Sequence, residues 1–241
     1  MTDPCFAHPR LAAVYDVFDP DRGDLAAYTG MAEEFGARRV LDIGCGTGVF
    51  ALLLAEHGFE VTGVDPAAAS VDVARSKPGA DRVRWIVGEA ADVPPRGADL
   101  ATMTGNVAQA VSDPDAWRRA LEGAYGALRP GGRLVFETRD PARRAWEEWT
   151  PGRTRRSEHV PGVGTVETWQ ELVAVRGPLV TFRGTYVFAA DGQVLTSEST
   201  LRFRGRDEVA ADLAAHGYVL DEVRGAPDRP GREFVFVARR P

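Results

Sequence analysis

The stretch VLDIGCGTG at residues 40–48 decides how this chain folds. An apolar run ends at Asp42, and glycines then alternate at positions 44, 46 and 48. Glycine tolerates positive φ and lets a backbone come close to a ligand. The stretch therefore predicts a buried strand, a tight turn and the start of a helix, with the turn facing something that binds there.

Strand-like and helix-like segments alternate outward from this stretch. Apolar runs predict strands at 38–43, 60–64, 82–87, 98–103 and 133–138, and longer segments predict helices at 24–36, 48–58, 66–77 and 113–128. Pro66 is expected in the first turn of its helix and Ser112 as the N-cap of the last. This alternation predicts a doubly wound parallel sheet, which binds ligands beyond the carboxyl ends of its strands.

The period changes to two after residue 139. In LVTFRGTYVF (179–188), Val180, Phe182, Tyr186 and Phe188 share one face. About three antiparallel strands are expected over 160–204, with a hairpin turn at ADGQ (190–193). A helix at 206–217 and strands at 218–223 and 232–239 complete the chain. The predicted fold is α/β, a Rossmann-like seven-stranded sheet with its last strand antiparallel and a small antiparallel β insertion after strand five.

Composition restricts the classes of function. Residues are 44% hydrophobic and 27% charged, with a net charge of −6, which argues against a nucleic-acid partner. The 28 Arg beside a single Lys77 are typical of a high-GC bacterial genome. Two cysteines form no disulfide framework, and we find no secretory leader or run of about 20 apolar residues. The expected location is cytoplasmic, without membrane contact.

A dinucleotide site is the first alternative for the glycine loop. That fingerprint is G-x-G-x-x-G, whereas the spacing here is G-x-G-x-G. Asp42 precedes Gly44 by two residues and would repel a pyrophosphate at the helix N-terminus. The same carboxylate suits a ligand with a positive centre and no phosphate.

With Asp65 placed 23 residues after Asp42 and GEA at 88–90, the stretch resembles the first motif of the class I S-adenosylmethionine (SAM)-dependent methyltransferases of small-molecule type. The resemblance extends from about residue 30 to the end, except for 140–204, and implies SAM as the cofactor. It places Asp42 near the ammonium of the SAM amino-acid tail. The backbone of four loop residues would pass beneath that tail: Gly44, Cys45, Gly46 and Gly48.

The resemblance assigns the other cofactor contacts by position. Asp65 would accept hydrogen bonds from the ribose hydroxyls, and Pro66 would border the adenine. Glu89 and Ala90 would recognise the adenine amino group, with Asp92 as a competitor for that role. Tyr15 would either close over the cofactor or pack in the core. Thr104 belongs to the loop at 103–109, which in this family faces both cofactor and acceptor.

Acceptor-binding residues are sought in the loops after strands four and five. Asn106 and Gln109 could orient a polar small molecule. Arg139 could bind an acidic acceptor or pair with Asp140. Trp146, with Trp149 at helical spacing, could line the acceptor pocket or pack the insertion on the core. His159 is the candidate general base, the alternative being a solvated loop histidine. No metal site is expected.

The expected activity is methylation of an oxygen or nitrogen atom of a small molecule. The insertion resembles the layout of natural-product and amino-sugar N-methyltransferases. Two alternatives remain, an RNA methyltransferase using the Arg-rich segment 139–156 and a SAM-binding protein without transfer activity. The expected division is an N-terminal helical cover (1–37), a SAM-binding core (38–139), an insertion serving as lid or homodimer surface (140–204) and a C-terminal completion of the core (205–241).

Overall fold

Two β-sheets organise the chain in the computed structural model, which describes residues 2–95 and 97–241. The strands of the first sheet are Arg39–Ile43 (β1), Glu60–Asp65 (β2), Val83–Val87 (β3), Ala98–Met103 (β4), Leu128–Arg139 (β5), Val219–Gly225 (β10) and Glu233–Arg239 (β11). Those of the second sheet are Arg156–Val160 (β6), Gly164–Arg176 (β7), Leu179–Phe188 (β8) and Val194–Arg202 (β9).

The first sheet has the strand order β10-β11-β5-β4-β1-β2-β3. Neighbouring strands from β1 to β5 are parallel, and β11 is antiparallel to both β5 and β10. Four of the five residues of β1 are buried, as expected for a central strand covered on both faces. The predicted seven-stranded Rossmann-like sheet with an antiparallel last strand is confirmed.

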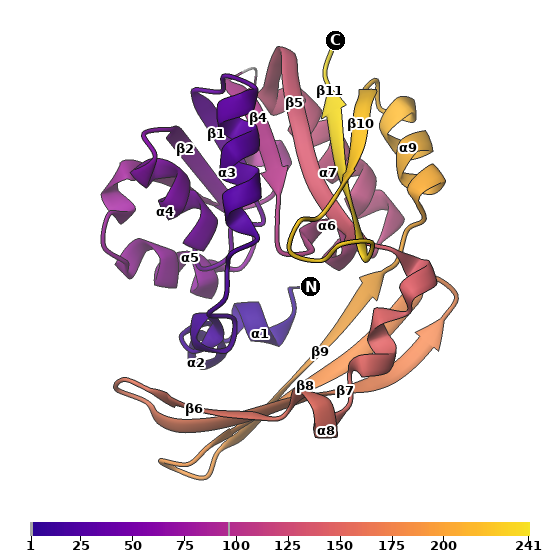
Figure 1. Ribbon diagram of the computed structural model, residues 1–241. Coiled ribbons are helices and arrows are strands. Elements are labelled where there is room, and N and C mark those ends of the chain that lie inside the picture. Colours follow the sequence, from indigo (N-terminus) through magenta and orange to yellow (C-terminus); the bar gives the residue numbers. More distant parts are fainter. Residues whose placement is uncertain (1, 96) are drawn as a thin grey trace.

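Helices cover both faces of this sheet (Figure 1). The α-helices are Pro4–Ala7 (α1), Pro9–Ala12 (α2), Leu25–Glu34 (α3), Val49–Glu56 (α4), Ala68–Ser76 (α5), Val107–Ala110 (α6), Pro114–Ala127 (α7), Pro151–Thr154 (α8) and Arg206–Ala215 (α9). Short 3₁₀ helices are Tyr15–Phe18 (η1), Ala80–Arg82 (η2), Ala90–Asp92 (η3), Pro141–Arg143 (η4) and Ala145–Glu148 (η5). One apolar core joins the sheet to α3 and α4, and another joins it to α7 and α9.

Two predicted helix starts need correction. Helix α5 begins at Ala68, so Pro66 lies outside its first turn. The N-cap of α7 is Asp113 rather than Ser112, because the Asp113 side chain accepts a hydrogen bond from the backbone N–H of Ala116. Both differences shift a boundary by one or two residues and leave the elements in place.

The second sheet has four strands, in the order β6-β7-β8-β9, rather than the three expected. The missed strand is β6, in which four of five residues are exposed, so no apolar alternation marked it. The hairpin turn at 190–193 joins β8 to β9 as predicted. Val180 and Phe188, predicted to share one face of β8, are fully buried.

The N-terminal segment lies between the two sheets (Figure 1). Leu11 and Val14 are buried there against Val160, Val166 and Phe188 of the second sheet. Helices α1 and α2 also contact α5 beside the first sheet. The segment therefore ties the second sheet to the carboxyl edge of the parallel strands. In the described residues we find no helix with the length and apolar character needed to cross a membrane.

Candidate active site

The glycine loop connects β1 to α4 at the carboxyl end of the parallel strands. Gly44 and Gly48 have φ of 72° and 81°, in the left-handed region. A Cβ on Gly44 would lie 2.4 Å from Cγ2 of Val107, and a Cβ on Gly48 would lie 2.5 Å from the Trp85 ring. Both the backbone conformation and the close packing therefore require glycine at these positions.

Asp42 is buried within β1, directly before this loop. It is 1% exposed and accepts a hydrogen bond of 3.2 Å from Oγ1 of Thr102. Burial raises its pKa to about 7, and the negative charge of Asp65 adds to this effect, while Arg22 opposes it. The loop thus begins beside a buried acid that gains free energy from a bound cation.

Asp65 ends β2 and holds the glycine loop from the neighbouring strand. Its Oδ2 accepts a hydrogen bond of 2.9 Å from the backbone N–H of Gly46, and its Oδ1 accepts one of 2.8 Å from Ala67. Burial raises the pKa of Asp65, and these two hydrogen bonds oppose the rise. Each oxygen keeps a further lone pair for a ligand.

The loop and both acids open into a cavity of about 400 Å³, here called the cofactor cavity. Most of the residues predicted to bind the cofactor line it: Tyr15, Asp42, Gly44, Cys45, Gly46, Asp65, Pro66, Glu89, Ala90 and Thr104. Gly48 is the exception, because it faces Trp85. The structure therefore brings ten residues from five separate segments of the chain to one cavity.

Glu89 and Asp92 both belong to the capping box at the start of η3, and of the two only Glu89 lines the cofactor cavity. Asp92 accepts a hydrogen bond of 2.8 Å from the backbone N–H of Glu89 and caps the short helix η3. Glu89 lines the cofactor cavity, with its carboxylate 3.6 Å from Arg119. Asp92 therefore acts only as a capping residue, whereas Glu89 also faces the cavity.

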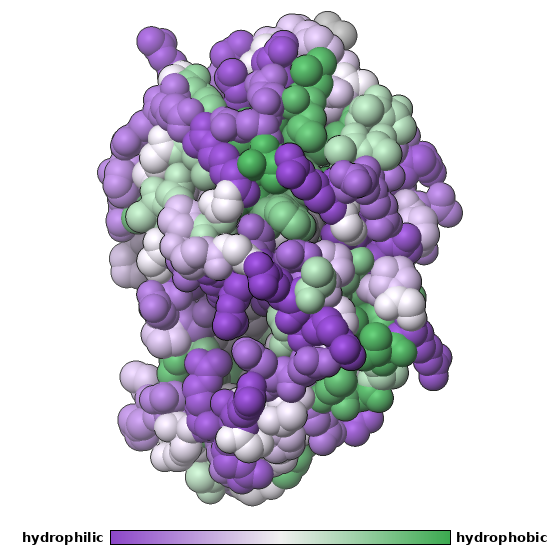
Figure 2. Space-filling model, turned by 45° about the vertical axis from the view of Figure 1, so that its right-hand side comes forward, coloured by the Kyte–Doolittle hydropathy of each residue, from purple (hydrophilic) through white to green (hydrophobic). Residues whose placement is uncertain are grey.

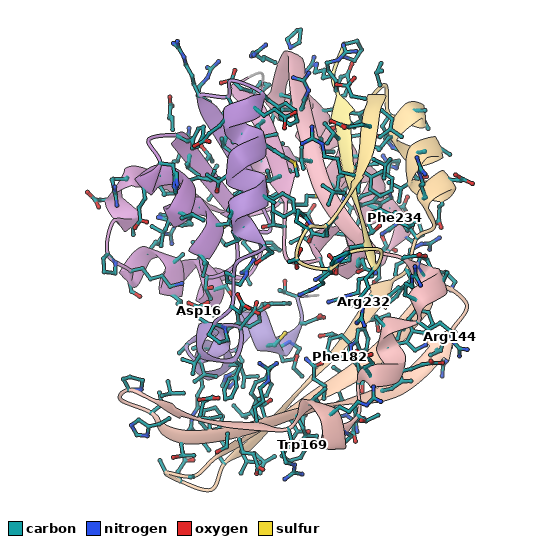
Figure 3. The ribbon with its side chains drawn as sticks, viewed as in Figure 1. Asp16, Arg144, Trp169, Phe182, Arg232 and Phe234 are labelled. Carbon is teal, nitrogen blue, oxygen red and sulfur yellow. The ribbon has the colours of Figure 1, made fainter. Side chains whose placement is uncertain are left out.

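The N-terminal cover is attached to the glycine loop by polar contacts. Asp16 of η1 accepts a hydrogen bond of 2.5 Å from Oγ1 of Thr47 and forms an ion pair of 2.5 Å with Lys77 (Figure 3). Lys77 also donates a hydrogen bond to the carbonyl of Thr47. Phe6 and Tyr15 lie in contact over the cofactor cavity, with their ring centroids 5.5 Å apart. These contacts place the N-terminal cover beside the cofactor cavity.

A second cavity of about 310 Å³ adjoins the first and is here called the acceptor cavity. Tyr15, Arg22 and Gly105 line both cavities. Trp169 and Tyr186 of the second sheet line its far side. On the face shown in Figure 2, hydrophilic residues gather across the middle of the molecule, where the two sheets meet.

Glu137 is the most buried acid of the acceptor cavity, and it was not among the site residues predicted from the sequence. It lies near the end of β5, is 4% exposed and accepts hydrogen bonds of 2.7 Å from the Tyr28 hydroxyl and 2.6 Å from the backbone N–H of Asn106. Burial raises its pKa to about 7. An acid inside the apolar run RLVFETR was the signal that could have identified it. Arg22 was also not predicted as a site residue, because it lies outside every predicted strand.

Two of the predicted acceptor contacts line the acceptor cavity, namely Asn106 and Arg139. Arg139 lies 3.7 Å from Glu233 of β11 rather than pairing with Asp140. Gln109 is fully buried behind it and accepts a hydrogen bond of 3.3 Å from the Arg139 backbone. Gln109 thus supports the end of β5 and does not line the cavity.

Trp146 and His159 are placed away from both cavities. Trp146 packs on Phe203 with the ring centroids 4.6 Å apart, and neighbouring Trp149 packs on Phe182, which Figure 3 labels. Both tryptophans therefore have packing roles and do not line the acceptor cavity, which is the second of the two alternatives. His159 is exposed on β6, on the opposite face from buried Val160, because side chains alternate along a strand. This position corrects the expectation of a general base at 159.

Comparison with known proteins agrees with this arrangement. Residues 40–132, which contain the glycine loop and Asp65, match the family model described as a methyltransferase domain. Residues 40–132 are therefore similar to a methyltransferase domain. The fold of the chain is the Rossmann-like fold of the class I SAM-dependent methyltransferases, so the resemblance stated from the motifs is confirmed. The matched segment runs from β1 into β5 and includes Asp42 and Asp65 of the cofactor cavity.

Three relatives illustrate the range of this methyltransferase domain. Glycine N-methyltransferase of Rattus norvegicus is 32% identical over 56% of this chain and 53% of its own length. The chain thus spans about half the length of that curated relative. A sugar N-methyltransferase from Streptoalloteichus sp is 27% identical, covers 95% of this chain and 93% of its own, and has a TM-score of 0.71. An amino pentose methyltransferase from Micromonospora echinaspora, solved with SAM bound, is 26% identical over 95% and 97%, with a TM-score of 0.65.

Proposed function

We propose that this chain transfers a methyl group from SAM to a small molecule. The observation that carries the proposal is the pair of adjoining cavities, one built on the glycine loop with Asp42 and Asp65, the other closed by the second sheet. The donor fits the first cavity because SAM carries an ammonium and a sulfonium, and the buried acids there favour a cation. The full-length match to two solved methyltransferases of sugars or amino pentoses supports the same function.

We assign the cofactor contacts as follows. Asp42 holds the ammonium of the amino-acid tail, above the backbone of Gly44, Cys45 and Gly46. Asp65 accepts the ribose hydroxyls, and the adenine is bordered by Pro66, Glu89 and Ala90. Tyr15 and Thr104 close the cavity near the acceptor side. Gly48 acts indirectly, by allowing the helix α4 to start against Trp85.

SAM supplies an activated methyl group, so the protein needs to align an acceptor with it and exclude water. Orientation of this kind contributes up to about 7–11 kcal/mol in ideal cases. Tyr15, Arg22 and Gly105 border both cavities and fix the relative position of donor and acceptor. The contact of Asp16 with Thr47 and Lys77 holds the cover over the donor.

The Arg-rich segment does not form a free basic stripe. Its guanidinium groups are largely within ion-pair distance of carboxylates in the same region: Arg139 with Glu233, Arg143 with Asp140, Arg144 with Glu147, Arg153 with Glu148 and Arg155 with Glu167. RNA binding requires unpaired positive charge facing the phosphates. We therefore prefer a small-molecule acceptor.

The remaining assignments concern cellular context and assembly. We propose a cytoplasmic enzyme of a bacterium, supported by two free, buried cysteines and by the Arg-rich composition. We assign 1–37 as the cover, 38–139 as the SAM-binding core and 205–241 as its completion. Residues 140–204 form the lid, and the exposed Leu172, Val173 and Val175 on β7 make its outer face the candidate homodimer surface.

The proposed function predicts turnover of SAM in the presence of a suitable acceptor. Purified protein incubated with SAM and a panel of amines, phenols, sugars and carboxylates should release S-adenosylhomocysteine with at least one acceptor. Calorimetry should show SAM binding in the micromolar range and no binding of NADH. Binding of NADH in place of SAM would contradict the proposal, and so would SAM binding without transfer to any acceptor class.

SAM affinity should depend on pH through Asp42. The pKa of this group is raised to about 7 in the free protein, and a bound ammonium stabilises its anion. Binding therefore releases a proton below pH 7, and affinity should fall about tenfold per pH unit as the pH drops from 7 to 5. Calorimetry across pH 5–8.5 measures this slope. In Asp42→Asn the affinity should be lower and the slope should disappear; an unchanged slope would contradict the assignment of Asp42.

A further inference from the structure

Of the two buried acids that line the acceptor cavity, Glu137 and Glu233, only Glu233 has a cation beside it in the described residues. Glu233 lies 2.8 Å from Arg229 and 3.7 Å from Arg139. In the described part of the chain, no Arg or Lys lies within ion-pair distance of Glu137. Its two hydrogen bonds, from Tyr28 and Asn106, occupy one position on each oxygen and leave others free. A buried carboxylate of this kind gains free energy from a cationic ligand.

The cavity around Glu137 has an excess of negative charge. Six carboxylates line it, belonging to Asp19, Asp21, Asp24, Glu137, Asp228 and Glu233, against four guanidinium groups, those of Arg22, Arg139, Arg156 and Arg229. Three of these arginines are already within ion-pair distance of an acid in the same cavity. The remaining negative field favours a cationic acceptor over a neutral or anionic one.

We propose, building on the methyl transfer proposed above, that the acceptor is a small primary or secondary amine that enters as an ammonium ion, and that Glu137 binds this ammonium and takes its proton. Glu137 is then a catalytic residue, since it contacts the reacting nitrogen. Asn106 and Tyr28 position the carboxylate.

The step balances as follows. The ammonium N–H bond breaks, its proton moves to the Glu137 carboxylate, and the nitrogen keeps the electron pair. The nitrogen then forms the N–C bond to the methyl group, while the C–S bond breaks and its electron pair returns to sulfur, which becomes a neutral thioether. The products are an N-methylammonium ion and S-adenosylhomocysteine. Glu137 releases its proton to water when the acceptor cavity opens.

The acidity of Glu137 suits an amine better than an alcohol. Burial raises its pKa to about 7. An alkylammonium such as that of lysine has a pKa of about 10.4, only about three units higher. Water, the reference for a hydroxyl acceptor, is a far weaker acid than an alkylammonium and lies beyond the reach of this carboxylate. A positive sulfonium nearby further lowers the pKa of a bound ammonium by charge repulsion.

The first test compares matched acceptors that differ only in the reacting atom. Suitable pairs are D-glucosamine with D-glucose, benzylamine with benzyl alcohol, and glycine with glycolate, each assayed for S-adenosylhomocysteine. We expect transfer to at least one amine and none to its hydroxyl partner. Transfer to hydroxyl members alone would overturn the amine inference and leave the methyl transfer intact. Failure of SAM to bind at all would instead overturn the proposed function.

The second test replaces Glu137 with its neutral isostere. In Glu137→Gln, kcat/KM for the amine should fall about 100-fold or more, the usual contribution of a general base. SAM affinity should stay within about threefold of the parent protein, which also shows that the variant is folded. Glu222→Gln, an exposed acid paired with Arg224 on β10, is the matched control and should retain full activity. Full activity in Glu137→Gln would overturn the proposal.

The pH profile separates proton transfer from a purely structural role. The groups facing Glu137 are Tyr28 on α3, Asn106 before α6, Glu233 on β11 and, through charge alone, Arg139 and Asp42. At saturating SAM, kcat/KM for the amine should rise with pH through about 7. Tyr28→Phe removes a hydrogen bond that favours the anion, so the rise should move to higher pH. In Glu137→Gln the rise of kcat/KM with pH should be absent. An unchanged rise in this variant would contradict the role of Glu137 as proton acceptor.

Discussion

Replacing Asp65 by alanine is expected to weaken SAM binding by about 100-fold or more. Asp65 is assigned to both ribose hydroxyls, and a hydrogen bond to a charged group contributes about 1.5–3 kcal/mol. Two such bonds amount to about 3 kcal/mol or more, and each 1.4 kcal/mol is about a tenfold change in affinity. The substitution also removes the hydrogen bond from the Gly46 N–H, which holds the glycine loop.

A matched control lies on the next helix. Asp72→Ala on α5 removes an exposed carboxylate, paired at the surface with Arg75, and should leave SAM affinity unchanged. Asp65→Asn keeps one acceptor oxygen and should give an intermediate loss of about tenfold. Calorimetric titration of the three variants with SAM measures the effect. Equal affinities of Asp65→Ala and Asp72→Ala would show that Asp65 does not bind the ribose.

The first sheet could be predicted from the sequence because each strand and helix carries its own local pattern. Buried parallel strands such as β1 and β4 are largely apolar runs, and Gly58 follows the end of α4. The strand β6 could not be predicted, because an exposed edge strand with one buried residue leaves no periodicity. Its position depends on pairing with β7, a contact made only in the folded chain.

The cofactor cavity was largely predictable, and the acceptor cavity was not. Asp42 and Asp65 lie at fixed distances from the glycine loop, so one motif indicates both. The acceptor cavity is formed by the cover, the end of β5 and the second sheet, which are far apart in the chain. Sequence reasoning selected His159 for its chemistry, whereas strand alternation directs it away from the cavity. Glu137 was overlooked because an acid within a strand is usually assigned to the surface.

Gly44→Ala is expected to destabilise the fold by about 3 kcal/mol and to weaken SAM binding. Its φ of 72° adds backbone strain of about 1–2 kcal/mol for a residue with a Cβ. The new Cβ would also lie 2.4 and 2.7 Å from the two γ-carbons of Val107, and overpacking of this kind costs about 1–3 kcal/mol. Val107 is β-branched and has little freedom to turn away. Chemical denaturation measures the loss of stability.

A double-mutant cycle separates the two contributions. Val107→Ala removes the clashing γ-carbons, so the cost of Gly44→Ala should fall by about 1–2 kcal/mol in that background, while the strain should remain. Gly46→Ala provides the control: its φ is 52°, but its Cβ would meet no side chain within 4 Å. The loss of stability caused by Gly46→Ala should be the same with and without the Val107→Ala substitution. Strict additivity of Gly44→Ala and Val107→Ala would show that packing against α6 does not determine the choice of glycine at 44, and would leave backbone conformation as the sole reason for it.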